Sequence, residues 1–202
     1  MASLAGARKA LAGYLTRPVV RALEEVPLTP NQITVLGFLV IVVAAALVAT
    51  GHLLAGGLAV LAGGFLDIVD GALARSTGKV TRFGGVLDST LDRVSEGVLL
   101  FGILWLALGK ELPVLTAAVP TRWAVVVVFG ALLGSLLVSY VRSRAETAGV
   151  ECTEGLFTRG ERVVVLVAGL LSGQVFLAVA LIGGLSFVTA GQRLLFVYQR
   201  AR

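Results

Sequence analysis

Two uncharged apolar runs limit the structures that this chain can adopt. Residues 32–50 and 123–141 each contain no Asp, Glu, Lys or Arg. Each run is close to the ~20 residues that an α-helix needs to cross a ~30 Å hydrocarbon core. The composition agrees, because only 14% of the 202 residues are charged, whereas soluble domains carry about 25%. The chain is therefore predicted to be an integral membrane protein.

The other apolar segments complete a predicted bundle of six transmembrane helices over residues 28–199. Thr29 and Pro30 open the first span with helix-capping chemistry. Residues 163–192 are also uncharged, but one helix of that length would run ~45 Å, which exceeds the hydrocarbon core. The polar sequence 171–174 therefore predicts a break between two helices. After the first span, the predicted helices cover about 52–74, 84–109, 118–146, 156–171 and 175–199.

The distribution of basic residues predicts the orientation of this bundle. Six spans place both termini and the loops around 75–82 and 144–162 on one side, with fifteen of the 17 Lys and Arg residues. Basic residues gather on the cytoplasmic side of membrane proteins. We therefore expect a multi-pass protein of the cell membrane with both termini in the cytoplasm, and no nucleic-acid partner.

The N-terminal segment, residues 1–25, differs from the spans. It mixes basic and apolar residues without a continuous apolar core. This pattern predicts an amphipathic helix that lies along the membrane surface. The whole chain, residues 1–202, is thus predicted to be a single all-α integral membrane domain.

Four aspartates lie close to the connection between the second and third predicted spans. Asp67 and Asp70 are three residues apart, and Asp88 and Asp92 are four apart, so each pair shares one helix face. Neighbouring antiparallel helices bring the two pairs together near the cytoplasmic face. Ionised carboxylates repel one another in a low-dielectric site unless cations neutralise them. Oxygen ligands favour hard ions such as Mg²⁺ or Mn²⁺, and a pair of metals clamps transferring phosphoryl groups.

The residues between the aspartates permit two interpretations. Arg75 and Lys79 supply positive charge for a phosphate, and Gly71, Ala74 and Gly84 leave space for a ligand. The alternative is that the four acids only pair with four neighbouring basic residues. Ionisable groups within membrane spans are functional by default, which favours phosphate binding.

These residues also match a family signature. The pattern Asp70-Gly71-x-x-Ala74-Arg75, followed after eight residues by Gly84-x-x-x-Asp88-x-x-x-Asp92, resembles that of the CDP-alcohol phosphotransferase family. Every fixed position is present, Asp67 adds the upstream acid, and the six-span layout is similar as well. The resemblance implies transfer of a phosphatidyl-type group from CDP-diacylglycerol or CDP-archaeol to an alcohol, with release of CMP. It also implies a homodimer.

The same resemblance implies roles for individual residues. Two Mg²⁺ ions, with Mn²⁺ as an alternative, would be held by Asp67, Asp70, Asp88 and Asp92, and Asp92 would also be the catalytic base. The residues implied to bind the CDP-linked lipid are Asn31, Gln32, Thr34, Gly71, Ala74, Arg75, Thr81 and Gly84. Helix capping is an alternative role for Asn31 and Gln32.

Three later arginines bear on the acceptor alcohol. The sequences around 139–149, 156–164 and 192–194 resemble the phosphatidylinositol-phosphate synthases of this family, although Arg142 replaces a common lysine and Gly160 a proline. Matching positions imply that Arg142, Arg159 and Arg193 bind the phosphate of inositol 1-phosphate. A cluster of guanidinium groups suits a phosphorylated acceptor. Glu96, one turn beyond Asp92, is expected either to support a metal ligand from behind or to form an ion pair, rather than to bind the metal itself.

Two other functions are open at this stage. A phosphatidylglycerol-phosphate synthase would use the same metals with glycerol 3-phosphate as acceptor. A divalent-cation channel or transporter would line a pore with the acids, but it does not explain Gly71-x-x-Ala74-Arg75. The sequence also leaves open whether the donor lipid is built on diacylglycerol or on an archaeal ether.

Overall fold

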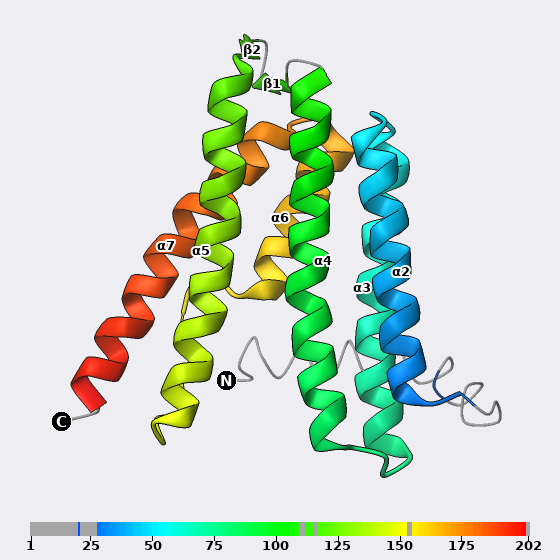
Figure 1. Cartoon of the computed structure of the whole chain (residues 1–202), viewed down its shortest axis with the longest axis vertical. Helices are drawn as coiled ribbons and strands as arrows, with labels where there is room; N and C mark the ends of the chain where they lie inside the picture. Colours follow the sequence, from blue (N-terminus) through cyan, green and yellow to red (C-terminus); the bar gives the residue numbers. More distant parts are fainter. Residues whose placement is uncertain (1–19, 21–27, 110–111, 115–116, 153–154, 201–202) are drawn as a thin grey trace, which may run out of the picture.

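A computed structural model describes residue 20 and residues 28–109, 112–114, 117–152 and 155–200. Within these residues the chain forms six helices and one short hairpin (Figure 1). The elements are α2 (Pro30–Ala49), α3 (Leu53–Ser76), α4 (Arg82–Gly109), β1 (Leu112–Val114), β2 (Ala117–Val119), α5 (Thr121–Thr147), α6 (Arg159–Ser172) and α7 (Val175–Arg200). The predicted surface helix, residues 1–25, falls outside the described residues apart from Val20, so it stays a prediction.

Local chemistry explains where the helices begin and end. At the start of α2, the Thr29 backbone N–H donates to the Gln32 side chain at 2.8 Å, and the Gln32 N–H donates to the Thr29 hydroxyl at 3.3 Å. This reciprocal capping box satisfies donors that an unprotected helix end leaves open. Gly173 ends α6 in the left-handed region with φ 72°, and α7 begins at Val175. The predicted break at 171–174 is confirmed.

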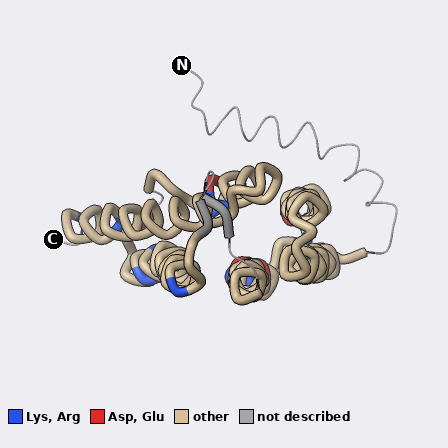
Figure 2. Tube along the Cα trace, turned by 90° about the horizontal axis from the view of Figure 1, so that it is seen from above, with Lys and Arg blue, Asp and Glu red and all other residues tan. Residues whose placement is uncertain are grey.

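The helices pack into one elongated bundle when seen from above (Figure 2). α2 contacts α3 and α4, α5 contacts α7, and α6 lies against α3 and α7. One buried apolar cluster draws residues from all six described helices. α3 and α4 are consecutive and antiparallel, and they are joined by the connection 77–81 (Figure 1). The last turns of α3 and the first turns of α4 therefore share one end of the bundle.

Four helices, α2, α3, α5 and α7, are long and apolar enough to cross a membrane. Large apolar side chains such as Leu36, Phe101 and Phe129 lie exposed on the outside of the bundle, as lipid contact requires. α4 carries Asp88, Asp92 and further charges in its first half. α6 has only 14 residues and therefore runs ~21 Å, which is short of the hydrocarbon core. Four of the six predicted spans are thus confirmed as candidates, and the other two stay predictions.

The connection between α4 and α5 is a structure that the sequence did not predict. β1 and β2 pair antiparallel, with Leu112 opposite Val119 and Val114 opposite Ala117. The fourth span was predicted to begin at residue 118, whereas α5 begins at Thr121. Pro120 immediately precedes α5, and proline suits a helix start because its fixed φ and missing N–H cost nothing there. The all-α class is confirmed, with the hairpin as an addition.

Candidate active site

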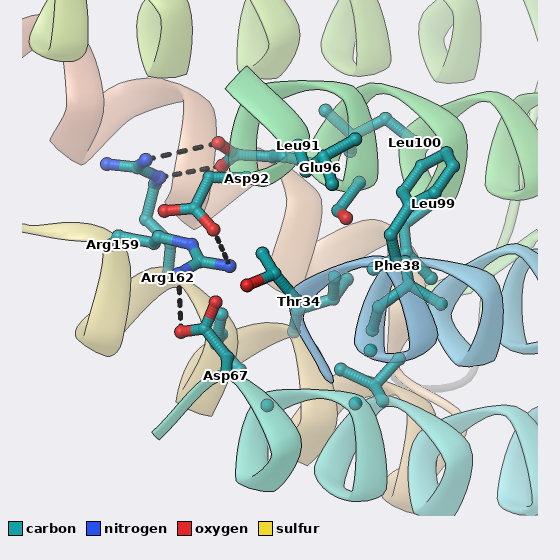
Figure 3. A pocket seen from close by; sticks show the side chains of 18 of the residues that line it. Thr34, Phe38, Asp67, Leu91, Asp92, Glu96, Leu99, Leu100, Arg159 and Arg162 are labelled. Atoms are coloured by element: carbon teal, nitrogen blue, oxygen red, sulfur yellow. Dashed lines mark hydrogen bonds and ion pairs between the residues drawn. The ribbon is translucent and has the colours of Figure 1, made fainter. Parts of the chain in front are cut away.

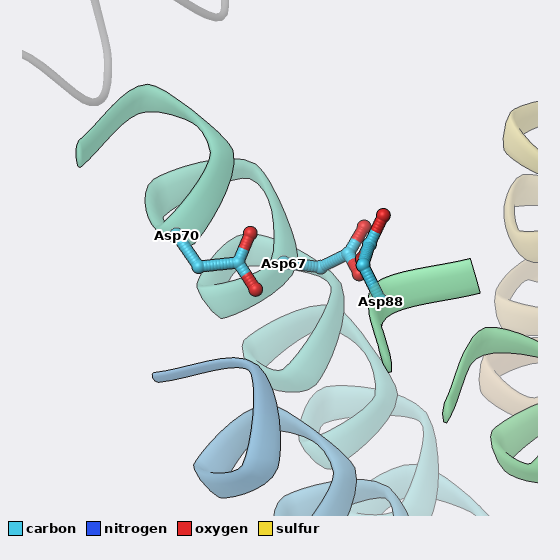
Figure 4. Close-up of side chains that lie close together, drawn as sticks. All are labelled: Asp67, Asp70 and Asp88. Atoms are coloured by element: carbon cyan, nitrogen blue, oxygen red, sulfur yellow. The ribbon is translucent and has the colours of Figure 1, made fainter. Parts of the chain in front are cut away.

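Three of the four predicted metal ligands meet at one end of the bundle. Asp67 and Asp70 project from the second half of α3, and Asp88 projects from the start of α4 (Figure 4). One carboxylate oxygen of each residue lies within 4.8 Å of those of the other two. The spacing of three residues between Asp67 and Asp70 sets both on one face of α3, and the antiparallel α4 brings Asp88 to them. The predicted meeting of the two helices is confirmed for these three acids.

The chemistry of this cluster fits a divalent cation. Asp70 is only 5% exposed, and its Oδ2 has no hydrogen-bond partner among the described residues. A buried carboxylate oxygen without a partner is costly, and two further carboxylates beside it add repulsion. A hard cation with oxygen ligands such as Mg²⁺ or Mn²⁺ relieves both costs.

Asp92 is not part of this group of three, and it pairs with an arginine that also contacts Asp67. Arg159, the first residue of α6, donates from Nη1 to Asp67 Oδ2 at 2.9 Å and lies 2.7 Å from Asp92 Oδ1 through Nη2. Figure 3 shows this guanidinium between the two carboxylates. Arg159 therefore connects α6 to both α3 and α4. The predicted roles of Asp92 as metal ligand and base stay predictions.

A small apolar cavity of about 60 Å³ continues from these charged groups into the bundle. Thr34 and Phe38 of α2 line it beside Asp67 and Asp92 (Figure 3). The charged groups thus lie at the boundary between an apolar interior and a polar end of the molecule.

A second cavity, of about 200 Å³, lies on the other side of Asp92 and collects the predicted acceptor residues. Arg142 of α5, Arg159 of α6 and Arg193 of α7 all line it. We call this space the arginine cavity. The full set of its lining residues is Asp92, Arg93, Glu96, Val138, Ser139, Arg142, Thr158, Arg159, Arg162 and Arg193. Arginines from three helices therefore line one cavity, as the resemblance of their surrounding sequences implied.

The predicted arginines are held in this cavity by protein partners. Buried Arg193 donates from Nη1 to the Val138 backbone carbonyl at 2.6 Å. Arg142 donates from Nε to Glu146 Oε1 at 2.8 Å, one turn further along α5. These contacts fix the guanidinium positions before any ligand arrives.

Arg162 is a cavity residue that was not among the predicted acceptor residues, although it lies in the segment 156–164 that resembles the phosphatidylinositol-phosphate synthases. In the structure it forms two hydrogen bonds to Glu96, so the predicted ion pair of Glu96 is confirmed. Its spacing could have identified it as a cavity residue, because Arg162 follows Arg159 by three residues and shares its face of α6.

The residues predicted to bind the CDP-linked lipid gather where α2, α3 and α4 meet. The Gly84 N–H donates to Thr81 Oγ1 at 2.9 Å. A Cβ added to Gly84 would lie 3.0 Å from Asn31 Oδ1, so glycine permits the close approach of these groups. The Arg75 guanidinium covers Gly71, where an added Cβ would lie 3.2 Å from Nη1.

The other predicted residues of this set have local contacts. Gln32 completes the capping box of α2, so its alternative role as a cap is confirmed. Thr34 donates to the Pro30 carbonyl at 3.1 Å and lines the apolar cavity. Ala74 is half-buried and lies two residues before Ser76, the last residue of α3. Lipid binding by the set stays a prediction.

Comparisons with known proteins agree with this geometry. The family model described as CDP-alcohol phosphatidyltransferase matches residues 27–190. The archaetidylinositol phosphate synthase of Methanothermobacter thermautotrophicus is 38% identical over 197 residues, which cover 92% of this chain and 94% of that protein.

Solved structures are similar as well. The phosphatidylinositol phosphate synthase of Mycobacterium tuberculosis with CDP-DAG bound matches with a TM-score of 0.80 and 32% identity, covering 92% of this chain and 94% of that chain. The same enzyme in complex with manganese and citrate also matches with a TM-score of 0.80, at 33% identity, covering 91% and 88%. The resemblance inferred from the aspartate signature is confirmed, and this chain belongs to the CDP-alcohol phosphatidyltransferase family.

Proposed function

We propose that this protein transfers a phosphatidyl-type group from a CDP-linked lipid to inositol 1-phosphate and releases CMP. The observation that carries the proposal is that the carboxylate cluster and the arginine cavity are neighbours. Arg159 contacts Asp67 of the cluster and also Asp92, and both Arg159 and Asp92 line the arginine cavity. The first suits the diphosphate of the donor with its metals, and the second suits the phosphate of the acceptor. The similar synthases carry inositol phosphate in their names, which supports this acceptor.

The metal would be held by Asp67, Asp70 and Asp88, with Asp92 contributing to a second ion. The ions are Mg²⁺, with Mn²⁺ as the alternative, and the similar structure with manganese supports a divalent ion. When bound, such ions neutralise the negative charge that develops on the diphosphate and its leaving group.

The chain's own residues then orient the reactants. Arg142, Arg159 and Arg193 bind the acceptor phosphate through charge-assisted hydrogen bonds and turn one free hydroxyl group of the inositol ring toward the donor. That hydroxyl oxygen forms a bond to the lipid-side phosphorus while the bond to the bridging oxygen breaks, and CMP leaves with the bridging oxygen. Asp92 accepts the hydroxyl proton, because it alone of the four aspartates lines the arginine cavity.

The donor would lie at the ends of α2, α3 and α4. Its nucleotide would contact Asn31, Thr81 and Gly84, which lie close to one another. Gly71, Gln32, Thr34, Ala74 and Arg75 would complete its surroundings. Arg75 is exposed at the end of α3 and suits a diphosphate oxygen.

The same proposal includes the arrangement in the membrane. All six helices would form one domain in the cell membrane, with the active site and both termini on the cytoplasmic side, because basic residues concentrate there. The protein would act as a homodimer. A cysteine-labelling experiment on the connections 77–81 and 148–152 tests the orientation, since both must react from the cytoplasmic side only.

A CMP-release assay tests the reaction. Purified protein in detergent with Mg²⁺ receives CDP-diacylglycerol or CDP-archaeol as donor, and inositol 1-phosphate, glycerol 3-phosphate or free inositol as acceptor. We expect CMP with inositol 1-phosphate alone, and a preference between the two donors identifies the lipid class. Equal turnover with glycerol 3-phosphate contradicts the proposed acceptor.

Two variants accompany this assay. Asp92→Asn should lower CMP release at least about 100-fold, the range expected for loss of a general base. Glu151→Gln changes an exposed acid outside the site and should keep the rate. Full activity in Asp92→Asn removes Asp92 from its proposed role.

A further inference from the structure

A buried ion pair joins α4 to α6 beside the arginine cavity. Arg162 is 3% exposed, and it donates to Glu96 through Nε at 2.7 Å and through Nη2 at 3.1 Å. Figure 3 shows the two parallel contacts between this guanidinium and the carboxylate. A two-point contact of this kind fixes the plane of the guanidinium and the direction of its remaining nitrogen.

The remaining nitrogen lacks a partner. Nη1 of Arg162 is buried and has no hydrogen-bond partner among the residues that the structure describes. Because Nε and Nη2 face Glu96, Nη1 lies on the opposite side of the guanidinium. Arg162 lines the arginine cavity together with Arg142, Arg159 and Arg193. A buried donor left without an acceptor is unfavourable, and Arg162 lines both cavities, so an oxygen of a bound ligand would improve this position.

We propose that Glu96 is a positioning residue for the acceptor phosphate, acting through Arg162. The inference rests on the proposed function, since the oxygen that meets Nη1 would belong to the phosphate of the acceptor. Glu96 has two effects in this arrangement. It neutralises the buried charge of Arg162, and it prevents the guanidinium from turning toward the nearby carboxylate of Asp92.

The position of Glu96 on α4 makes the second effect important. Glu96 follows Asp92 by four residues and lies on the same helix face. Asp92 already pairs with Arg159 at 2.7 Å. If Arg162 were released from Glu96, it would compete for Asp92, which is the proposed base. Glu96 therefore leaves Arg162 available to the ligand, and Asp92 then pairs only with Arg159.

If the ion pair of Glu96 and Arg162 served only to hold α4 against α6, its loss would have a different effect. Loss of a tie lowers stability and affects both substrates alike, because removal of one partner from a buried pair leaves an uncompensated charge. Loss of a positioning residue affects the acceptor selectively. It also reduces the stabilisation that a bound phosphate gives, because a misdirected Arg162 holds the anion less tightly.

The experiment compares Glu96→Gln and Glu96→Asp with the exposed control Glu151→Gln. CMP release gives KM for inositol 1-phosphate and for the CDP-linked lipid, and thermal unfolding gives Tm with and without inorganic phosphate. For Glu96→Gln we expect KM for inositol 1-phosphate to rise about 10-fold, as for a misdirected charged hydrogen bond, with KM for the donor within about twofold. Glu96→Asp should recover part of this loss because it keeps the charge.

Thermal unfolding provides a readout that does not depend on turnover. Inorganic phosphate should raise the Tm of Glu96→Gln by less than it raises that of the unaltered protein, because weaker binding gives a smaller shift, and Arg162→Lys should show the same reduction. Equal changes in both KM values, or the same phosphate-induced Tm shift in every variant, overturn the proposal. If inositol 1-phosphate gives no CMP but the phosphate shifts behave as expected, the proposed acceptor fails and the positioning by Glu96 stands.

Discussion

The carboxylate cluster and the arginine cavity each bring like charges together, but they differ in how far protein partners neutralise those charges. In the cluster, Asp67, Asp70 and Asp88 approach within 4.8 Å, and Oδ2 of Asp70 has no partner among the described residues. In the cavity, each of the five lining arginines has a protein acceptor. These acceptors are the Ser89 carbonyl for Arg93, Glu146 for Arg142, Asp67 and Asp92 for Arg159, Glu96 for Arg162, and the Val138 carbonyl for Arg193.

This difference indicates which charge and which contacts a ligand must supply in each region. The three carboxylates share one ion pair among the described residues, that of Asp67 with Arg159, so they require a further cation to bring charge, and without it most of their repulsion is unrelieved. Arg142, Arg159 and Arg162 are already paired with carboxylates, so at these three an anion supplies little missing charge and is recognised mainly by the directions of the remaining N–H groups. The comparison predicts large effects from neutral substitutions in the cluster and graded, substrate-selective effects in the cavity.

The largest effect should come from Asp70→Asn. The amide keeps the shape of the side chain but removes a charge and a metal ligand, and a catalytic metal contributes several kcal/mol. We expect CMP release to fall at least about 100-fold and the affinity for Mn²⁺, measured by the EPR signal of the free ion, to fall at least about 10-fold. The Tm without metal should stay the same or rise, because the repulsion from Asp67 and Asp88 is reduced.

Glu151→Gln is the matched control for Asp70→Asn, because it also removes one acid but lies outside the cluster. It should change neither Mn²⁺ binding nor turnover. If Asp70→Asn binds Mn²⁺ as tightly as the unaltered protein, the cluster is not the metal site and the contrast with the cavity no longer holds.

The two regions also differ in how far the sequence predicts them. Asp67, Asp70 and Asp88 lie within one segment on two consecutive helices, so helical spacing and a short connection suffice to bring them together. The partners of Arg159 and Arg162 lie 92 and 66 residues away in the sequence. Their ion pairs depend on how α6 packs against the rest of the bundle, which no local pattern specifies.

The fold shows the same division between local and long-range information. Apolar length predicted the helices, and the polar sequence 171–174 predicted the break that Gly173 makes. The hairpin between α4 and α5 was missed because its strands have only three residues each, too few for an alternating pattern. The position of Asp92 beside Arg159 was also missed, since family resemblance assigned Arg159 to the acceptor alone.

An intermediate effect is expected from Arg193→Lys in the arginine cavity. Lysine keeps the charge but loses the planar group that holds the Val138 carbonyl and faces the ligand at the same time. Because a hydrogen bond to a charged group contributes about 1.5–3 kcal/mol, KM for inositol 1-phosphate should rise about 10-fold or more. KM for the CDP-linked lipid should stay within about twofold.

Arg200→Lys is a suitable control on the same helix. Arg200 lies over the ring of Phe196 at 4.4 Å from its centroid and does not line the cavity. Its replacement should leave both KM values unchanged. A rise in both KM values for Arg193→Lys would mean that Arg193 supports the bundle rather than the acceptor.

The smallest effect should come from Glu146→Gln, which removes the partner of Arg142. The two side chains are 51% and 49% exposed, and an exposed pair four residues apart on a helix contributes only about 0.3–0.5 kcal/mol. KM for inositol 1-phosphate should therefore rise by no more than about threefold, and 0.5 M salt should remove the difference because it screens exposed charges. The buried pair of Glu96 and Arg162 should be far less sensitive to salt. A loss for Glu146→Gln as large as that for Glu96→Gln would show that burial does not decide how strongly an arginine is directed, and the contrast between exposed and buried partners within the cavity would fail.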